Sequence, residues 1–107
     1  MRMLMKWTLG TREASEAIRS GRMADVDKTL DELTKPEAQY FGTEGGSRTG
    51  YVFFDLVDPS DIPLIAEPLF QELNATGEFI PVMNVEELQR GLAQAAQAEG
   101  ANGKESR

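Results

Sequence analysis

Apolar residues along this chain fall into short runs separated by glycine, proline and polar residues. The longest strongly β-prone run is Tyr51–Val57, preceded by Gly50 and followed by the turn-forming residues 58–61. A run of this length between turn residues predicts a strand buried on both faces, and therefore central in a sheet. Residues 2–8 alternate two sets that are both largely apolar. They predict a second strand that is covered on both sides.

The first helical segment follows Gly10, with Thr11 as the expected N-cap. Apolar residues at helical spacing continue as far as Leu33, but Gly21 interrupts them. A glycine at this place predicts a kink or two consecutive helices. The segment is expected to end before Pro36, because the residue before a proline is disfavoured in helical geometry.

Two further helices are expected nearer the C-terminus. Residues 62–73 place five apolar side chains on one helical face. Asn84 and Glu87 have the spacing of a capping box, which predicts the start of a final helix. Residues 99–107 contain little apolar surface and are expected to form a disordered tail, leaving a single domain over residues 1–98.

Two shorter strands complete the pattern, at residues 38–41 and 78–83. Pro81 lacks a backbone N–H and confines its strand to a sheet edge. Residues 42–50 contain four glycines and are expected to form a flexible, exposed hairpin loop. The order of elements predicts an α+β protein with a ferredoxin-like split βαβ arrangement. Its four-stranded antiparallel sheet has the order 4-1-3-2, with an additional C-terminal helix.

The second face of this sheet is also apolar, since helices cover only one side. Leu4, Tyr40, Phe53 or Phe54, and Phe79 would leave an uncovered patch larger than a soluble monomer normally exposes. A two-fold partner that packs its own sheet against this face would cover the patch. We therefore expect a homodimer.

Charge and composition narrow the function classes. The 107 residues carry a net charge of −7, which disfavours nucleic acid and anionic membrane surfaces as partners. The chain has no cysteine and no histidine. It therefore lacks the commonest general base and the commonest metal ligands, and we expect no metal and no cofactor. No run approaches the roughly 20 apolar residues that span a bilayer, so a cytoplasmic protein is expected.

Several segments resemble the dimeric α+β barrel superfamily, in which two ferredoxin-like sheets close face to face. They are the strand, turn and helix start over residues 51–63, the helical residues 66–70, the strand residues 79–83, and Pro36 with residues 40–41. Together they are similar to small bacterial proteins of that superfamily. Its members include muconolactone-isomerase-like proteins, cofactor-independent quinone-forming monooxygenases, haem-degrading enzymes and stress-response barrels. The haem-degrading members typically bind iron through a histidine, which this chain lacks.

Lys6 and Asp55 are charged residues inside the two central strands, where unpaired burial is expensive. If their parity matches, they could line one cavity, with Lys6 polarising a ligand carbonyl and Asp55 and Tyr51 handling protons. The simpler alternative is a structural salt bridge, or side chains that reach solvent from the strand ends.

Aromatic and charged residues suggest a ligand pocket. Trp7, Tyr40 and Phe53 could wall a site for a flat substrate, although ordinary core or dimer packing explains them equally. Arg48, in the glycine-rich loop, could close over an anion, but the loop lacks the features of a phosphate-binding loop. Glu67 could project from a helix kink towards the sheet, or lie on the solvated flank.

These residues leave two functional hypotheses. In the first, the barrel of a homodimer binds a small aromatic or amphipathic molecule in its interior. In the second, the same interior belongs to a cofactor-independent isomerase or monooxygenase acting on a small cyclic substrate. The sequence does not decide whether the protein is an enzyme.

Overall fold

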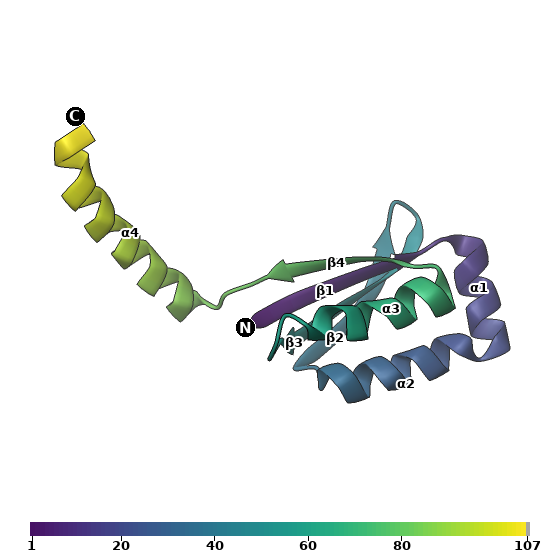
Figure 1. The fold of residues 1–107 in the computed structure, drawn as a ribbon. Coiled ribbons are helices and arrows are strands. Elements are labelled where there is room, and N and C mark those ends of the chain that lie inside the picture. Colours follow the sequence, from purple (N-terminus) through teal and green to yellow (C-terminus); the bar gives the residue numbers. More distant parts are fainter. Residues whose placement is uncertain (107) are drawn as a thin grey trace.

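The computed structural model describes residues 1–106. It has an α+β fold, and its elements alternate much as the hydrophobic pattern predicts (Figure 1). In chain order they are β1 (Arg2–Leu9), α1 (Thr11–Ser20), α2 (Arg22–Thr34), β2 (Ala38–Glu44), β3 (Ser47–Asp55), α3 (Asp61–Leu73), β4 (Thr76–Pro81) and α4 (Val85–Ser106).

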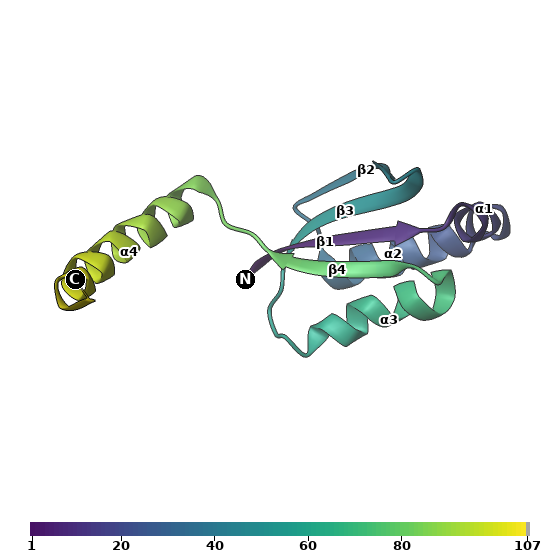
Figure 2. The same cartoon turned by 90° about the horizontal axis from the view of Figure 1, so that it is seen from above.

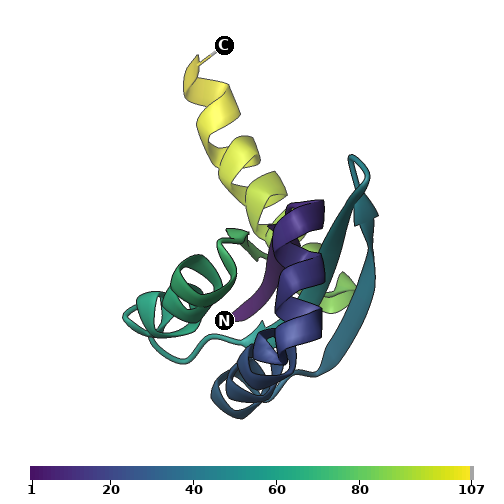
Figure 3. The ribbon, with the colours of Figure 1, turned by 90° about the vertical axis from the view of Figure 1, so that its right-hand side faces the viewer.

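The four strands form one antiparallel sheet in the order β2-β3-β1-β4. This is the predicted order 4-1-3-2 read from the other edge, so the sheet prediction is confirmed. β1 lies in the centre and pairs with both β3 and β4. Pro81 lies on the edge strand β4, as expected of a residue without a backbone donor. Helices α2 and α3 lie along one face of the sheet (Figures 1 and 3).

Alternation along β1 and β3 separates the two faces of the sheet. We call the face under the helices the covered face, and it contains most of the core. The core residues that β1 and β3 place on this face are Met3, Met5, Trp7, Leu9, Val52 and Phe54. The opposite side is the open face, to which β1 and β3 contribute Arg2, Leu4, Lys6, Thr8, Thr49, Tyr51, Phe53 and Asp55. Leu4 and Phe53 are only partly buried in the single chain. The expectation that both central strands are buried on both faces is therefore wrong for the chain alone.

The helical segment after Gly10 divides into α1 and α2 at Gly21, as predicted. Gly21 has φ +84°, a left-handed conformation that side chains rarely adopt. Thr11 is not the N-cap of α1, because Gly10 occupies that position and no side chain caps the helix. In α3 the expected apolar face is buried through Ile65 and Leu69, and the helix continues through Pro68.

The region expected to be a flexible loop, residues 42–50, is mostly strand. Only Gly45 and Gly46 form the turn, both with positive φ, at 58° and 81°. Such a two-residue turn matches the natural twist of a β-hairpin and lets the two strands pair up to its ends. β2 therefore extends to Glu44 and β3 begins at Ser47. This correction matters for the site, because it places Glu44 and Arg48 on strands.

Helix α4 starts as the sequence predicts and then leaves the body. The backbone N–H of Asn84 donates to Glu87 at 2.9 Å, and that of Glu87 donates to the Asn84 side chain at 2.8 Å. This reciprocal pair is a capping box. Beyond it, α4 projects past the end of the sheet where β1 begins (Figures 1 and 2). Disorder over residues 99–107 stays a prediction, and Arg107 lies outside the described residues. Within them, no helix combines the length and apolarity needed to cross a bilayer.

Candidate functional site

The open face contains a cluster of charged and hydroxyl groups built across three strands. Lys6 lies opposite Tyr51 on β3 and opposite Glu78 on β4. Its ammonium group donates to Oε1 of Glu44 at 3.0 Å and lies 3.7 Å from a carboxylate oxygen of Glu78. The Tyr51 hydroxyl donates to Oε2 of Glu44. We call Lys6, Glu44, Tyr51 and Glu78 the lysine cluster.

The local backbone explains how Glu44 reaches the lysine cluster. Gly42 comes between Tyr40 and Glu44 on the same face of β2, opposite Thr49. A Cβ atom at Gly42 would lie 3.7 Å from the ring of Tyr51, so this ring packs over the glycine. The ring therefore points towards the hairpin, where Glu44 accepts the hydroxyl hydrogen bond.

The hydrogen bonds hold the groups of the cluster in their ordinary charge states. The bonds from Tyr51 and Lys6 lower the pKa of Glu44, and the bond to Glu44 raises the pKa of Lys6. The same carboxylate raises the pKa of the Tyr51 hydroxyl. Each shift moves the pKa of the group further from 7, so none of the three is tuned as a general acid or base near pH 7. The cluster is better suited to binding than to proton transfer.

The cluster has a defined pH window of stability. Glu44 has a folded pKa below its usual 4.5, so its contribution is present above pH 4.5 and is lost as the pH falls through the folded value. Lys6 has a folded pKa above 10.5, so its contribution is present below that pH and is lost on further raising the pH. We expect Tyr51→Phe to raise the pKa of the Glu44 carboxyl, as measured by carbon NMR titration. Tyr40→Phe is the matched control, and an unchanged Glu44 titration in Tyr51→Phe would contradict the hydrogen bond.

Beside the lysine cluster, the open face is apolar. Leu4 lies opposite Phe53 on one side and Ile80 on the other, and Ala38 lies opposite Phe53 on β2. The rings of Tyr40 and Phe53 meet edge to face with centroids 6.4 Å apart. We call Leu4, Ala38, Tyr40, Phe53 and Ile80 the apolar patch. Polar and apolar groups thus share one face, arranged along the strand direction.

Asp55 does not join Lys6. In the register of β1 and β3 it lies opposite Arg2, four residues from the position opposite Lys6. Its carboxylate lies 2.7 Å from the amino group of Met1 and is well exposed. Of the three residues expected to handle protons, the structure brings together Lys6 and Tyr51 and separates Asp55.

The predicted ligand-binding residues lie on three different surfaces. Tyr40 and Phe53 belong to the apolar patch of the open face. Trp7 is buried on the covered face, where its ring meets Phe41 edge to face at 6.2 Å. Trp7 therefore cannot share a pocket wall with Tyr40 and Phe53. Arg48 is an exposed strand residue that donates to the hydroxyl of Ser15 at 3.3 Å, rather than a loop residue above an anion.

Trp7 and Arg48 do line a small cavity of their own, on the side of α1 and α2. It measures about 200 Å³ and includes Ile18, Met23, Asp27 and Phe41. Burial, with a smaller contribution from Asp31, raises the pKa of Asp27. The cavity is separated from the lysine cluster by the sheet itself.

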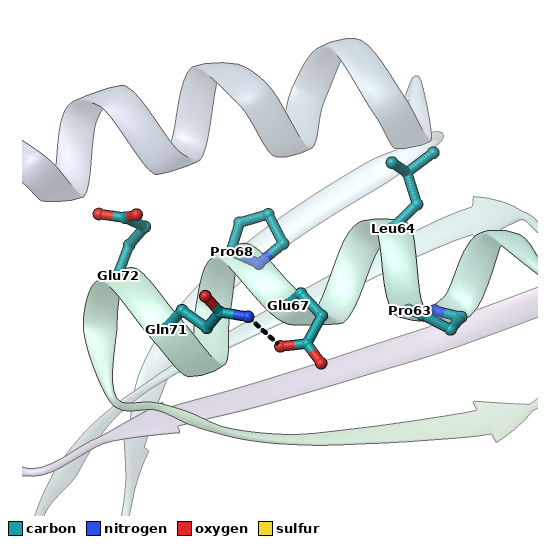
Figure 4. A pocket seen from close by; sticks show the side chains of 6 residues that line it. All are labelled: Pro63, Leu64, Glu67, Pro68, Gln71 and Glu72. Carbon is teal, nitrogen blue, oxygen red and sulfur yellow. Dashed lines mark hydrogen bonds between the residues drawn. The ribbon is translucent and has the colours of Figure 1, made fainter.

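Glu67 lies on the outer surface of α3 and accepts a hydrogen bond from Gln71 at 2.9 Å (Figure 4). Its neighbours Pro63, Leu64, Pro68 and Glu72 outline an open depression of about 580 Å³. Because Glu67 is exposed on the helix surface, it does not project towards the sheet as one prediction had it. Across the described residues, no three His, Cys, Asp or Glu side chains gather as a metal site would need.

The sequence reasoning missed Glu44 and Glu78 as partners of Lys6. Glu44 falls in the segment that the sequence predicts as a loop, although the Gly45-Gly46 pair before a β-prone run is a recognisable hairpin signal. Comparison of the chain with models of known protein families finds no matching family, and comparison with curated proteins finds no significant match. The open face, which combines charged, hydroxyl and aromatic side chains, is therefore the candidate functional surface.

Proposed function

We propose that the protein is a homodimer of ferredoxin-like subunits that binds a small aromatic or amphipathic molecule between two facing sheets. The observation that carries this proposal is the division of the open face into an apolar patch and a lysine cluster. Facing sheets pack about 10 Å apart, so a second copy would turn this surface into an enclosed chamber. Such a chamber corresponds to the dimeric α+β barrel that the sequence resembles.

The apolar patch would hold the flat or aliphatic part of the ligand. Phe53 offers a partly buried ring next to Tyr40, whose side chain is 62% exposed in the single chain. Aromatic faces of this kind favour stacked or edge-to-face rings. Burial of a ring against Phe53 and Leu4 would contribute a few kcal/mol, at about 25 cal/mol for each Å² of apolar surface.

The lysine cluster would orient the polar end of the ligand and select its charge. One ammonium group stands between two carboxylates, so the cluster carries a local charge of about −1 at neutral pH. A carboxylate on the ligand would be repelled, whereas a carbonyl or hydroxyl can accept a hydrogen bond from Lys6, whose ammonium group has three N–H donors. We therefore expect uncharged ligands, such as phenols or cyclic ketones, to bind better than anionic ones.

Light scattering over a dilution series tests the dimer, and a fluorescent probe tests the chamber. We expect a mass of twice 11.8 kDa that persists to low micromolar concentration. The neutral probe N-phenyl-1-naphthylamine is expected to bind at least about tenfold more tightly than the anionic 1-anilinonaphthalene-8-sulfonate, which is about 1.4 kcal/mol. Phe53→Ala should weaken the binding of the neutral probe by a similar factor.

Phe70→Ala serves as the control for the probe experiment, because Phe70 lies on α3 and contacts the covered side of β4 at Gly77. Equal binding of both probes, or no loss in Phe53→Ala, would count against the proposed chamber. The other hypothesis, a cofactor-independent isomerase or monooxygenase using Lys6, Tyr51 and Asp55, stays a prediction from the sequence.

A further inference from the structure

Among the helices of residues 1–106, α4 alone packs against no other element over most of its length. Every side chain of α4 from Val85 to Gly100 is exposed or nearly so, including Leu92 at 59%. The radius of gyration is 18.4 Å, whereas a compact domain of this length has about 13 Å. The molecule extends 62 Å along its longest axis because α4 projects from the body (Figures 1 and 2).

A helix in this position needs a packing partner. Isolated helices are marginal in water, since most helical stability in proteins comes from packing one apolar face. α4 also contains Gly91 and Gly100, and each glycine costs about 1 kcal/mol relative to alanine. Its apolar residues follow a three–four spacing that makes one stripe. We call Val85, Leu88, Leu92 and Ala95 the α4 stripe.

The start of α4 is held in place by ionic and backbone contacts. Arg2, on the open face at the beginning of β1, donates to Glu87 and lies 3.7 Å from Glu37. The capping bond from the Asn84 backbone, together with Arg2, lowers the pKa of Glu87. The N–H of Val82 also donates to the carbonyl of Arg2 at 3.1 Å. The first turn of α4 is thus anchored at the edge of the open face, while the stripe beyond it has nothing to cover.

The same chain supplies a complementary surface that is also uncovered. On the edge strand β2, at the side of the sheet away from α4, Tyr40 is 62% exposed on the open face and Phe41 is 64% exposed on the opposite face. When two sheets face each other about a two-fold axis parallel to the strands, β4 of each copy lies opposite β2 of the other. The end of β4 then lies level with Ala38, where β2 of the second copy begins, so a helix that continues from β4 starts beside the β2 edge of that copy.

We infer that α4 is an exchanged arm, which packs its stripe against the β2 edge of a second copy of this chain. The inference rests on the proposed dimer and adds that each subunit completes the chamber of the other. Leu88 and Leu92 would close the side of the chamber next to Tyr40 of the second copy. The open face is therefore an incomplete site in the single chain.

The area agrees with a stable dimer. The stripe from Val85 to Ala95 covers about 16 Å of helix about 10 Å wide, which corresponds to a footprint of roughly 160 Å². Each copy both provides and receives one arm, so the arms supply roughly 300 Å² of the ~800 Å² per partner of a standard interface. The facing sheets add to this area. A second copy would thus cover both the α4 stripe and the exposed β2 edge.

The double substitution Leu88→Glu/Leu92→Glu tests the arm in the full chain. Both residues are exposed in the single chain, so the domain should still fold, but two charges would be forced into the apolar contact. We expect the dimer dissociation constant to rise at least about 100-fold, or 2.7 kcal/mol. Gln94→Glu/Gln97→Glu is the matched control, because it adds the same charge to the opposite side of α4 and should leave the dimer intact.

Disulfide cross-linking identifies what the arm touches, and the cysteine-free chain makes it specific. When Leu92→Cys and Tyr40→Cys chains with different tags are mixed and oxidised, we expect a cross-link between chains, and none with Gln94→Cys. A double Cys variant that links within one monomer would show that α4 folds back on its own sheet, which overturns the inference. A native dimer unaffected by Leu88→Glu/Leu92→Glu would overturn the arm but leave the proposed chamber. A monomeric native protein would end both proposals.

Discussion

Phe53→Glu is expected to convert the dimer into a folded monomer. Phe53 lies in the middle of the apolar patch, is only partly buried in the single chain, and has no role in the helix-covered core. In facing sheets the substitution would remove a buried ring and place a carboxylate in an apolar contact, twice per dimer. Loss of the ring costs about 2 kcal/mol per site, and burial of the charge adds to that. The dissociation constant should rise by at least about 1,000-fold, or 4.1 kcal/mol.

Light scattering at micromolar concentration measures this change, and circular dichroism shows that the monomer keeps its fold. Leu64→Glu is the control: Leu64 is 56% exposed on the outer surface of α3, away from the open face (Figure 4). It adds the same charge and should leave the dimer unchanged. If Phe53→Glu still forms dimers with native affinity, the open face is not the interface between subunits.

The second large effect is expected at Gly50, the residue of β3 that lies directly opposite Trp7. A Cβ atom at Gly50 would come within 2.2 Å of the indole ring, closer than any real contact. Trp7 is 4% exposed and is part of the core, so it cannot move aside without loss of packing. We expect Gly50→Val to reduce the free energy of unfolding by about 3 kcal/mol, the upper range for overpacking a core.

A loss of this size lowers the melting temperature by roughly 12–20 °C for a domain of this length. Because Trp7 is the only tryptophan, its fluorescence should also shift to longer wavelength as the ring is displaced towards water. Gly42→Ala is the control on the neighbouring strand, where a Cβ atom would meet the Tyr51 ring at an ordinary 3.7 Å. Equal melting temperatures for the two variants would show that Trp7 does not pack against the backbone of β3 in this way.

The candidate site was accessible to sequence reasoning only in part. Alternation along the strands places Lys6 on one face of β1 and both Tyr51 and Asp55 on one face of β3. Which of them meets Lys6 depends on register, and the register pairs Lys6 with Tyr51 and Arg2 with Asp55. Register depends on long-range pairing and on the exact length of the hairpin. It is therefore not visible within either strand alone.

The face of the sheet on which Trp7 lies also depends on long-range packing. Both alternating sets of residues in β1 are largely apolar, so the pattern could not say which set faces the helices. Packing decides it: Gly50 leaves room for a large ring only on the covered face, and Trp7 occupies that space. Leu4 and Phe53 are consequently left on the open face with Tyr40.

Features that depend on neighbouring residues could be predicted from the sequence. These include the order of the elements, the break at Gly21, the edge position of Pro81 and the capping box at Asn84, because each follows from local backbone geometry or hydrogen bonding. The pairing of the strands and the packing of the helices were needed to show which side chains share a face and that α4 stands away from the sheet. Both features depend on packing between segments that are far apart in the sequence. Hydrophobic burial is non-directional, so the apolar pattern of one segment does not specify which other segment covers it.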